Sequence, residues 1–334
     1  MPVATHLVLH EHADAKEIVR DGHKLGQILE ETAQRFHAPM AIPLMDLTIE
    51  KAALLTARNI PVEKIDTYHF SEAPTGSYKI ALTPRMLVTC DALRYIAKKT
   101  GLLPVGMGIG PFSLMTKLLA DPITPVFLAG TGATAEEEPE VALVEKTLEL
   151  AEEVIGKYLQ AQIDAGAKAV FLCEPAANRV YFSPKQLDES YEVFDRYVME
   201  PNRRLRALLA ANDVDLIFHD CGELTDEMVR RFGTLDPAIL SLGSSRKLWE
   251  DGRLVPSTTV MYGNLPSKHF YSDTNISVEK VRLMAGELID KMSATGHPFI
   301  LGSECDVLSV PNCEASIWNK VNAFMECRCV KVPR

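Results

Sequence analysis

The sequence predicts an α/β fold, namely a (β/α)8 TIM barrel that forms a single domain with an N-terminal helical extension. Strand-like and helix-like segments alternate along almost the whole chain of 334 residues. The strand candidates are short, continuous apolar runs, which is typical of parallel strands that are covered on both faces. About seven to eight strand–helix units can be counted, and no domain boundary interrupts them. We therefore assign residues 1–38 to the extension and residues 39–334 to the barrel.

The strand candidates share an apolar composition and a length of a few residues. A Gly-x-Gly-x-Gly pattern at residues 106–110 lies inside one of them and runs into Pro111, so we reject a nucleotide-binding fingerprint there. The candidates in chain order are Met40–Met45, Leu103–Ile109, Ala167–Cys173, Val214–Phe218, Ala238–Leu242, Ser257–Tyr262 and Pro298–Leu301.

The helix candidates show apolar residues at the i, i+3, i+4 spacing, and several begin at a proline or an acidic first turn. Two segments without this spacing, 61–78 and 129–135, are expected to be loops over the barrel mouth. The helices are expected at Asp14–Phe36, Thr48–Leu55, Pro84–Lys99, Pro111–Leu119, Glu136–Ala165, Ser183–Ala211, Glu223–Phe232, Val278–Ala294 and Glu314–Met325.

The composition argues against several classes of protein. A formal net charge of −10 and the lack of a Lys/Arg-rich run argue against nucleic-acid binding. No run of about twenty apolar residues could cross a bilayer, and residues 1–17 contain no apolar signal segment. Seven scattered cysteines in a chain of this length indicate reduced thiols rather than a disulfide scaffold. We expect a cytoplasmic protein.

His219, Cys221 and Cys305 are the candidate metal ligands. His219 and Cys221 directly follow one strand candidate and Cys305 follows another, and 305 − 221 = 84 positions separate the cysteines, so only the fold could bring them together. The C-terminal ends of the strands carry the chemistry in β/α barrels. Two thiolates and one imidazole leave the fourth tetrahedral position open, which is the pattern of a working zinc site.

The donor set favours chemistry on sulfur. Two cysteine thiolates cancel the charge of Zn²⁺, so a third thiolate in the fourth position would keep its electron density and remain nucleophilic. A free thiol is only a few per cent ionised at neutral pH, and zinc removes that limit. Such a site suits alkyl transfer to sulfur better than the activation of water, for which histidine-rich sites prevail.

Alternatives to this ligand set stay open. A His-x-Cys pair is common, and a buried cysteine usually packs as a small hydrophobe. Glu304 and Cys313 are competing candidates for the site, with Cys313 expected at the start of a helix. Core packing is the favoured interpretation for Cys173. The remaining cysteines are interpreted as structural or incidental, namely Cys90, Cys327 and Cys329.

Several segments together resemble the uroporphyrinogen decarboxylase superfamily, over about residues 39–325. Within it they are most similar to the zinc-dependent cobalamin:thiol methyltransferases of the coenzyme M type, whose His-x-Cys…Cys motif maps onto His219, Cys221 and Cys305. The segments that carry the resemblance are Pro43–Glu50, Pro104–Phe112, Ala165–Ala169 with Glu174-Pro175 and Phe182–Pro184, Gly263–Leu265, and Gly296–Cys305.

The resemblance implies methyl transfer between a corrinoid such as methylcobalamin and a thiol or methylated small substrate. It also implies Zn²⁺ as the metal and catalytic roles for Glu174 and Asn264. The chain contains no Asp-x-His-x-x-Gly signature of a cobalamin-binding domain, so the corrinoid is expected on a separate protein, admitted near the loops 61–78 and 129–138. The methyl donor, the acceptor, the direction of transfer and the oligomeric state are left open, a homodimer included.

Two departures from the decarboxylases bear on the function. Their Arg-Gln-Ala-Gly-Arg loop is missing, and the first fifty residues contain only Arg20 and Arg35. Cys305 stands where the decarboxylases carry a histidine. Porphyrinogen decarboxylation needs cationic groups around several carboxylates, so a decarboxylase-like carboxy-lyase is the alternative reading, together with a non-catalytic, ligand-binding member of the superfamily.

Overall fold

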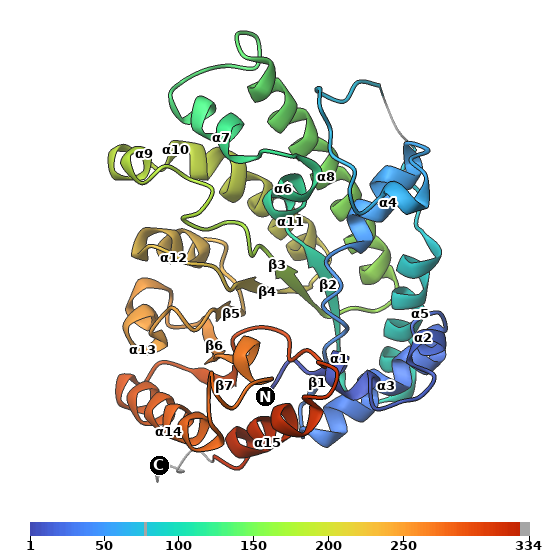
Figure 1. The fold of residues 1–334 in the computed structure, drawn as a ribbon, viewed down its shortest axis with the longest axis vertical. Helices are drawn as coiled ribbons and strands as arrows, with labels where there is room; N and C mark the ends of the chain where they lie inside the picture. Colours follow the sequence, from blue (N-terminus) through green and yellow to red (C-terminus); the bar gives the residue numbers. More distant parts are fainter. Residues whose placement is uncertain (77–78, 328–334) are drawn as a thin grey trace.

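The computed structural model describes residues 1–76 and 79–327 and confirms the predicted α/β barrel. Parallel strands form the centre of the molecule, and the helices surround them (Figure 1). The strands follow one another in sequence order within one curled sheet. They are β1 (Met40–Ala41), β2 (Leu103–Ile109), β3 (Ala169–Cys173), β4 (Asp215–Asp220), β5 (Ile239–Leu242), β6 (Val260–Leu265) and β7 (Phe299–Ser303).

The described residues form seven strands instead of eight, and the first residues of the chain lie in the gap between β7 and β1. Val3 forms a parallel bridge with Asp306. The Val3 carbonyl accepts a hydrogen bond from the Val307 amide at 2.7 Å. On the other side, the Thr5 hydroxyl donates to the carbonyl of Ile42 at 2.6 Å, just beyond β1. The segment thus fills the position that an eighth strand would take, although the sequence predicted only a helical extension there.

Helices α1 to α7 enclose the first part of the barrel. The predicted helix at 14–36 is divided, because the Asp21 side chain accepts hydrogen bonds from the amides of His23 and Lys24 and starts a new helix. The expected loop at 129–135 overlaps the end of α7, and residues 77 and 78 of the expected loop at 61–78 lie outside the described residues. The elements are α1 (Thr5–Leu9), α2 (Ala15–Ile18), α3 (Gly22–Arg35), α4 (Ile49–Ala57), η1 (Val62–Lys64), α5 (Pro84–Lys99), α6 (Pro111–Leu118) and α7 (Ile123–Gly130).

Helices α8 to α15 complete the ring. The predicted single helix at 183–211 is wrong, since Ser190 is extended and a π turn precedes Pro201, which has no amide hydrogen to donate. The elements are α8 (Pro139–Asp164), α9 (Pro184–Glu189), α10 (Glu192–Phe194), η2 (Asp195–Met199), α11 (Glu200–Ala211), α12 (Asp226–Gly233), α13 (Leu248–Asp251), η3 (Gly252–Leu254), η4 (Ser267–His269), α14 (Val278–Thr295) and α15 (Glu314–Met325).

Strand register places the ends of neighbouring strands at one rim. Cys173 of β3 is level with His219 of β4, and His219 is level with Ser241 of β5. Apolar side chains on the inner face, among them Met107, Phe171 and Tyr262, fill the barrel interior. A larger apolar cluster lies between the sheet and the helices. The rim is therefore held from inside and outside by packed side chains.

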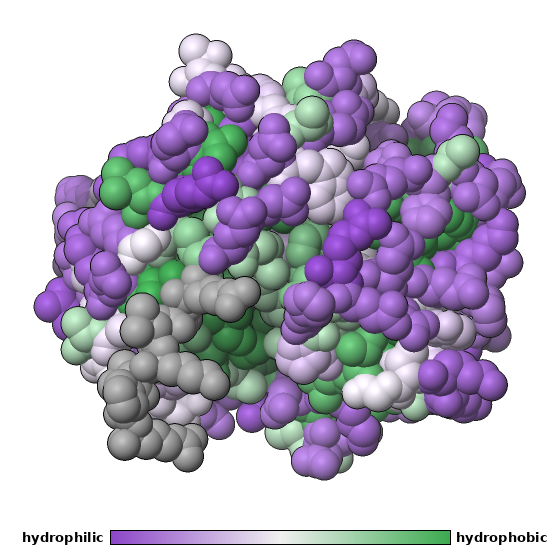
Figure 2. Space-filling view, turned by 90° about the horizontal axis from the view of Figure 1, so that it is seen from below, coloured by the Kyte–Doolittle hydropathy of each residue, from purple (hydrophilic) through white to green (hydrophobic). Residues whose placement is uncertain are grey.

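The face of the molecule seen from below in Figure 1 is mostly hydrophilic. It shows charged and polar side chains with apolar ones in the recesses between them (Figure 2). In the described part of the chain, no helix combines the length and the apolar composition needed to cross a bilayer.

Candidate metal centre

The structure brings His219, Cys221 and Cys305 together at the C-terminal rim of the barrel. His219 is the fifth residue of β4, Cys221 follows that strand directly, and Cys305 lies two residues beyond β7. One donor atom from each residue lies within 4.8 Å of the other two. The two sulfurs are 3.9 Å apart, far beyond the length of a disulfide bond. The three residues that the sequence singled out can therefore hold one ion.

His219 is oriented for metal binding. Its Nδ1 lies 2.9 Å from the hydroxyl oxygen of Ser241 on the adjacent strand. When Nδ1–H donates to that oxygen, the other ring nitrogen, Nε2, carries the lone pair. Nε2 is buried and has no hydrogen-bond partner in the described structure. A buried imidazole nitrogen without a partner, on a residue that converges with two thiols, fits the role of a metal ligand.

The sulfur separation also fits a zinc ion. Two sulfurs bound at about 2.3 Å in a tetrahedral arrangement stand about 3.8 Å apart. The separation of 3.9 Å between Cys221 and Cys305 matches that value without any movement of the backbone. The donor types, the free imidazole nitrogen and the distance therefore agree with Zn²⁺.

The two thiols hold one proton unequally. The hydrogen bond from the Cys305 thiol, with the nearby His219 ring and the charge of Lys268, lowers the pKa of Cys221 against the opposing effect of burial. The same hydrogen bond and burial raise the pKa of Cys305. The pair is thus one thiolate and one thiol, and a cation would replace the remaining proton.

Lys268 adds a positive charge beside the thiols. It belongs to η4, and its Nζ donates to the carbonyl oxygen of Cys221 at 3.4 Å. Burial opposes its charge, yet the negative groups at Cys221, Glu304 and Cys305 raise its pKa. Lys268 could not be predicted from the sequence, because nothing in its neighbourhood distinguishes a rim lysine from a surface lysine.

Asn264 and Glu304 hold the segment 243–246, which packs against Cys221. The Asn264 amide donates to the carbonyls of Gly243 at 2.9 Å and Arg246 at 2.8 Å. The Glu304 carboxylate accepts from the Ser244 amide at 2.9 Å. A Cβ on Gly243 would lie only 2.7 Å from the Cys221 carbonyl oxygen, so glycine is needed for this approach. Both side chains thus act on the position of Cys221.

Glu174 lies fully buried at the end of β3, and its carboxylate faces the start of α6. It accepts hydrogen bonds from the amides of Phe112 at 3.1 Å and Ser113 at 2.8 Å, and from Asn202 at 2.8 Å. Burial raises its pKa against these hydrogen bonds. A Cβ on Gly110 would meet the carboxyl carbon at 2.0 Å, which explains one glycine of the 106–110 pattern. A catalytic role for Glu174 stays a prediction.

The competing ligands are placed elsewhere. Cys313 precedes α15 and packs with the apolar cluster around that helix. Cys173 points into the barrel interior, with its sulfur 3.6 Å from that of Met107. Neither belongs to the group of converging metal donors in residues 1–76 and 79–327, and neither does Glu304. Cys90 is buried in α5, Cys327 follows α15, and Cys329 lies outside the described residues.

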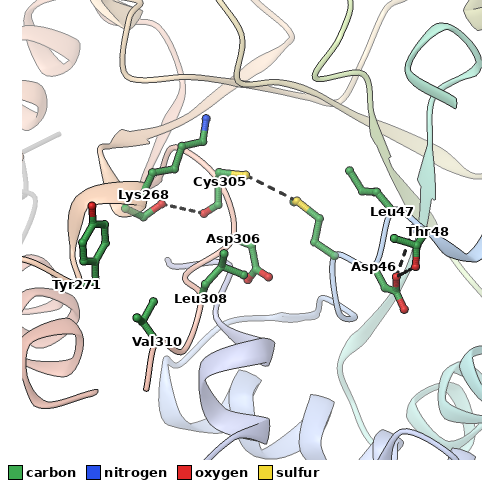
Figure 3. Close-up of a pocket in the computed structure, with 11 residues that line it drawn as sticks. Asp46, Leu47, Thr48, Lys268, Tyr271, Cys305, Asp306, Leu308 and Val310 are labelled. Carbon is green, nitrogen blue, oxygen red and sulfur yellow. Dashed lines mark hydrogen bonds between the residues drawn. The ribbon is translucent and has the colours of Figure 1, made fainter. Parts of the chain in front are cut away.

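A pocket of about 630 Å³ opens beside Cys305 (Figure 3). Its walls are mainly apolar, with Lys268 on one side and Asp306 on another; burial raises the pKa of Asp306 to about 7. The residues that line it are Met45, Asp46, Leu47, Thr48, Ser267, Lys268, Tyr271, Cys305, Asp306, Leu308 and Val310. A second pocket of about 370 Å³ shares Met45, Asp46, Asp306 and Leu308 with it. Space for a small-molecule substrate therefore adjoins one of the thiols.

Known structures share this fold at low sequence identity. A methyltransferase from Methanosarcina mazei superposes with a TM-score of 0.67 at 15% identity, covering 97% of this chain and 93% of its own. A B12-independent methionine synthase from Shewanella sp. W3-18-1, in complex with selenomethionine, gives a TM-score of 0.58 at 11% identity, covering 93% and 88%. No curated protein matches the chain in sequence.

A family profile covers nearly the whole chain. The profile described as uroporphyrinogen decarboxylase (URO-D) matches residues 5–327. This range contains all seven strands, the three converging donors and the pocket. The chain therefore belongs to the uroporphyrinogen decarboxylase family.

Proposed function

We propose that this protein is a zinc-dependent methyltransferase that moves a methyl group between a corrinoid and a thiol or a methylated small substrate. The observation that carries the proposal is the convergence of His219, Cys221 and Cys305 beside a pocket that Cys305 itself lines. Three protein donors leave one position for a substrate atom, as catalytic zinc sites require.

Zinc at this site would supply a thiolate at neutral pH without a protein base. Cys221 and Cys305 would neutralise the ion, and His219 would hold it from β4 through Nε2. Lys268, at the pocket wall, would balance the negative charge that a third thiolate brings. The printed descriptions of the two structural neighbours, a methyltransferase and a methionine synthase, support methyl chemistry as the class of reaction.

The corrinoid is proposed to come as a co-substrate on a separate protein. The chain has no Asp-x-His-x-x-Gly signature, so a bound cobalamin of its own is not expected. The pocket opens at the barrel mouth, where a partner carrying the cofactor could approach Cys305 from outside.

Decarboxylation of a porphyrinogen receives less support from the pocket. Such a substrate carries several carboxylates, and each needs a cationic partner. Lys268 is the one cationic side chain among the residues that line the larger pocket, and Asp46 and Asp306 would repel the substrate. Methyl transfer, which needs no such cluster of cations, agrees better with this lining.

Metal content and methyl transfer test the proposal together. We expect one zinc per wild-type chain and little or none in Cys221→Ser, with Cys90→Ser as a control that keeps the metal. Methylcobalamin incubated with a panel of small thiols should lose its methyl group, followed by its visible spectrum. Equal zinc in wild type and Cys221→Ser would exclude Cys221 from the site. Zinc binding with no turnover on any thiol or corrinoid protein would favour the non-catalytic alternative.

A further inference from the structure

Met45 brings a third sulfur to the candidate metal centre. It lies between β1 and α4, and it lines the same pocket as Cys305. Its Sδ is 3.8 Å from the Sγ of Cys305, the contact drawn between the two sulfur atoms in Figure 3. In the sequence, Met45 is the end of the strand candidate Met40–Met45 and part of the segment Pro43–Glu50, and neither pattern predicts a metal ligand.

The separation is that of two ligands on one ion. Tetrahedral zinc with sulfur ligands at about 2.3 Å places them about 3.8 Å apart. Cys305 stands 3.9 Å from Cys221 and 3.8 Å from Met45. Each of these two separations from Cys305 is therefore compatible with a pair of sulfur ligands on one zinc ion.

The chemistry of a thioether suits a replaceable ligand. Thioether sulfur is a soft donor, like thiolate, but it is neutral, so it leaves the charge of a Cys2His zinc centre at zero. A thiolate binds zinc more strongly because it is charged. Methionine is also unbranched and flexible, and Met45 is only partly buried, so its side chain can swing into the pocket when another sulfur binds.

We propose that Met45 is the fourth zinc ligand when no substrate is bound and that a substrate sulfur displaces it. This inference rests on the proposed metal centre, and it adds a residue that closes the centre at rest. An incoming thiol would give its proton to solvent, and Met45, which carries no proton, would return when the thiol leaves.

Zinc-edge X-ray absorption on selenomethionine-labelled, zinc-loaded protein tests the proposal directly. Selenium scatters more strongly than sulfur, so a selenium neighbour of zinc is distinguishable from the two cysteine sulfurs. We expect one selenium neighbour in the unmodified sequence and its loss on addition of excess 2-mercaptoethanol.

A pair of variants assigns the selenium to one of the twelve methionines. Met45→Leu should remove the zinc–selenium signal while the zinc itself stays. Met107→Leu is the matched control, because its sulfur lies 3.6 Å from Cys173, a thiol outside the donor group, and this variant should keep the signal. Because the labelled wild type is measured without any substitution, the test does not depend on the folding of a variant.

The outcomes separate this inference from the function on which it rests. Zinc bound with two sulfurs, one nitrogen and a light fourth neighbour would overturn the role of Met45 and leave the metal centre intact. A selenium signal that survives Met45→Leu would also overturn it. Failure to bind zinc at all would overturn the proposed function itself.

Discussion

Glu50 offers a sharp test of the buried electrostatics of this barrel. It lies on α4 with 1% of its surface exposed. One carboxylate oxygen accepts a hydrogen bond from the Ile109 amide at 3.1 Å, and the other is buried without a partner. Burial is the main cause that raises its pKa from 4.5 to about 8. The carboxyl group is therefore protonated in the folded protein at neutral pH.

The sign of the pH dependence follows from this difference. Below pH 4.5, Glu50 is protonated in both the folded and the unfolded chain, so it does not lower the free energy of unfolding. Between pH 4.5 and about 8 the unfolded chain loses the proton and the folded chain keeps it, so the free energy of unfolding falls as pH rises. The expected slope is about 1.4 kcal/mol per pH unit, which amounts to about 2 to 3 kcal/mol between pH 5 and pH 7.

Glu50→Gln removes this contribution with almost no change of shape. Glutamine can still accept from Ile109, and its amide does not ionise. Urea unfolding of both proteins at pH 5, 6, 7 and 8 should show the stability of the variant rising relative to wild type by about 1 kcal/mol or more per pH unit. Exposed Glu63→Gln is the control and should run parallel to wild type. Parallel curves for Glu50→Gln and wild type would refute the argument, because they would mean that Glu50 ionises in the folded protein.

Three further substitutions probe buried contacts, one of them at the metal centre. Ser241→Ala removes the hydrogen bond to His219 and should weaken zinc binding by about 10- to 100-fold in a chelator competition, with the fold unchanged by circular dichroism; undiminished affinity would mean that Ser241 does not orient the ring. Gly110→Ala places a Cβ 2.0 Å from the Glu174 carboxyl carbon and should lower the free energy of unfolding by more than about 3 kcal/mol. A decrease of less than about 1 kcal/mol in urea unfolding would contradict this close packing. Lys320→Met leaves the Phe270 carbonyl and Ser316 without their buried donor and should lower the free energy of unfolding by about 1 to 3 kcal/mol, measured in the same way. An unchanged free energy of unfolding would show that the three hydrogen bonds of Lys320 add little to stability.

The strands of the barrel could be predicted because their signal is local. A parallel strand covered on both faces is an apolar run. The predicted run at 103–109 coincides with β2, and the predicted run at 167–173 begins two residues before β3 and ends with it. The interruptions of the helices were harder to predict from the sequence. The break before α3 depends on the Asp21 side chain, and the turn at 195–199 depends on Pro201. The closure between β7 and β1 could not be read at all, because residues 1–5 carry no strand pattern and are placed by contacts about 300 positions away.

The site shows the same division between local and distant information. The three donors could be proposed from residue type and from their place at strand ends, because parallel strands bring their C-terminal ends to one rim. Lys268 and Met45 could not be predicted, because each is an ordinary residue outside the strands until the fold places it beside the two cysteines. The roles expected for Glu174 and Asn264 came from a family resemblance, and such a resemblance does not say where a side chain points. Here both side chains hold backbone segments in place.

Different parts of the rim hold the metal ligands and line the substrate pocket. His219, Cys221 and the segment 243–246 that supports them belong to β4, β5 and the loops that follow. The pocket walls come from residues 45–48, 267–271 and 305–310. Cys305 belongs to both sets, and so does Met45 in the resting centre proposed above. Substitutions in the apolar wall, such as Leu308 or Val310, should therefore alter which substrate fits while the affinity for the metal stays unchanged. This separation would let one centre serve different substrates through changes in the segments that line the pocket, as expected where strand ends fix the chemistry and loops shape the pocket.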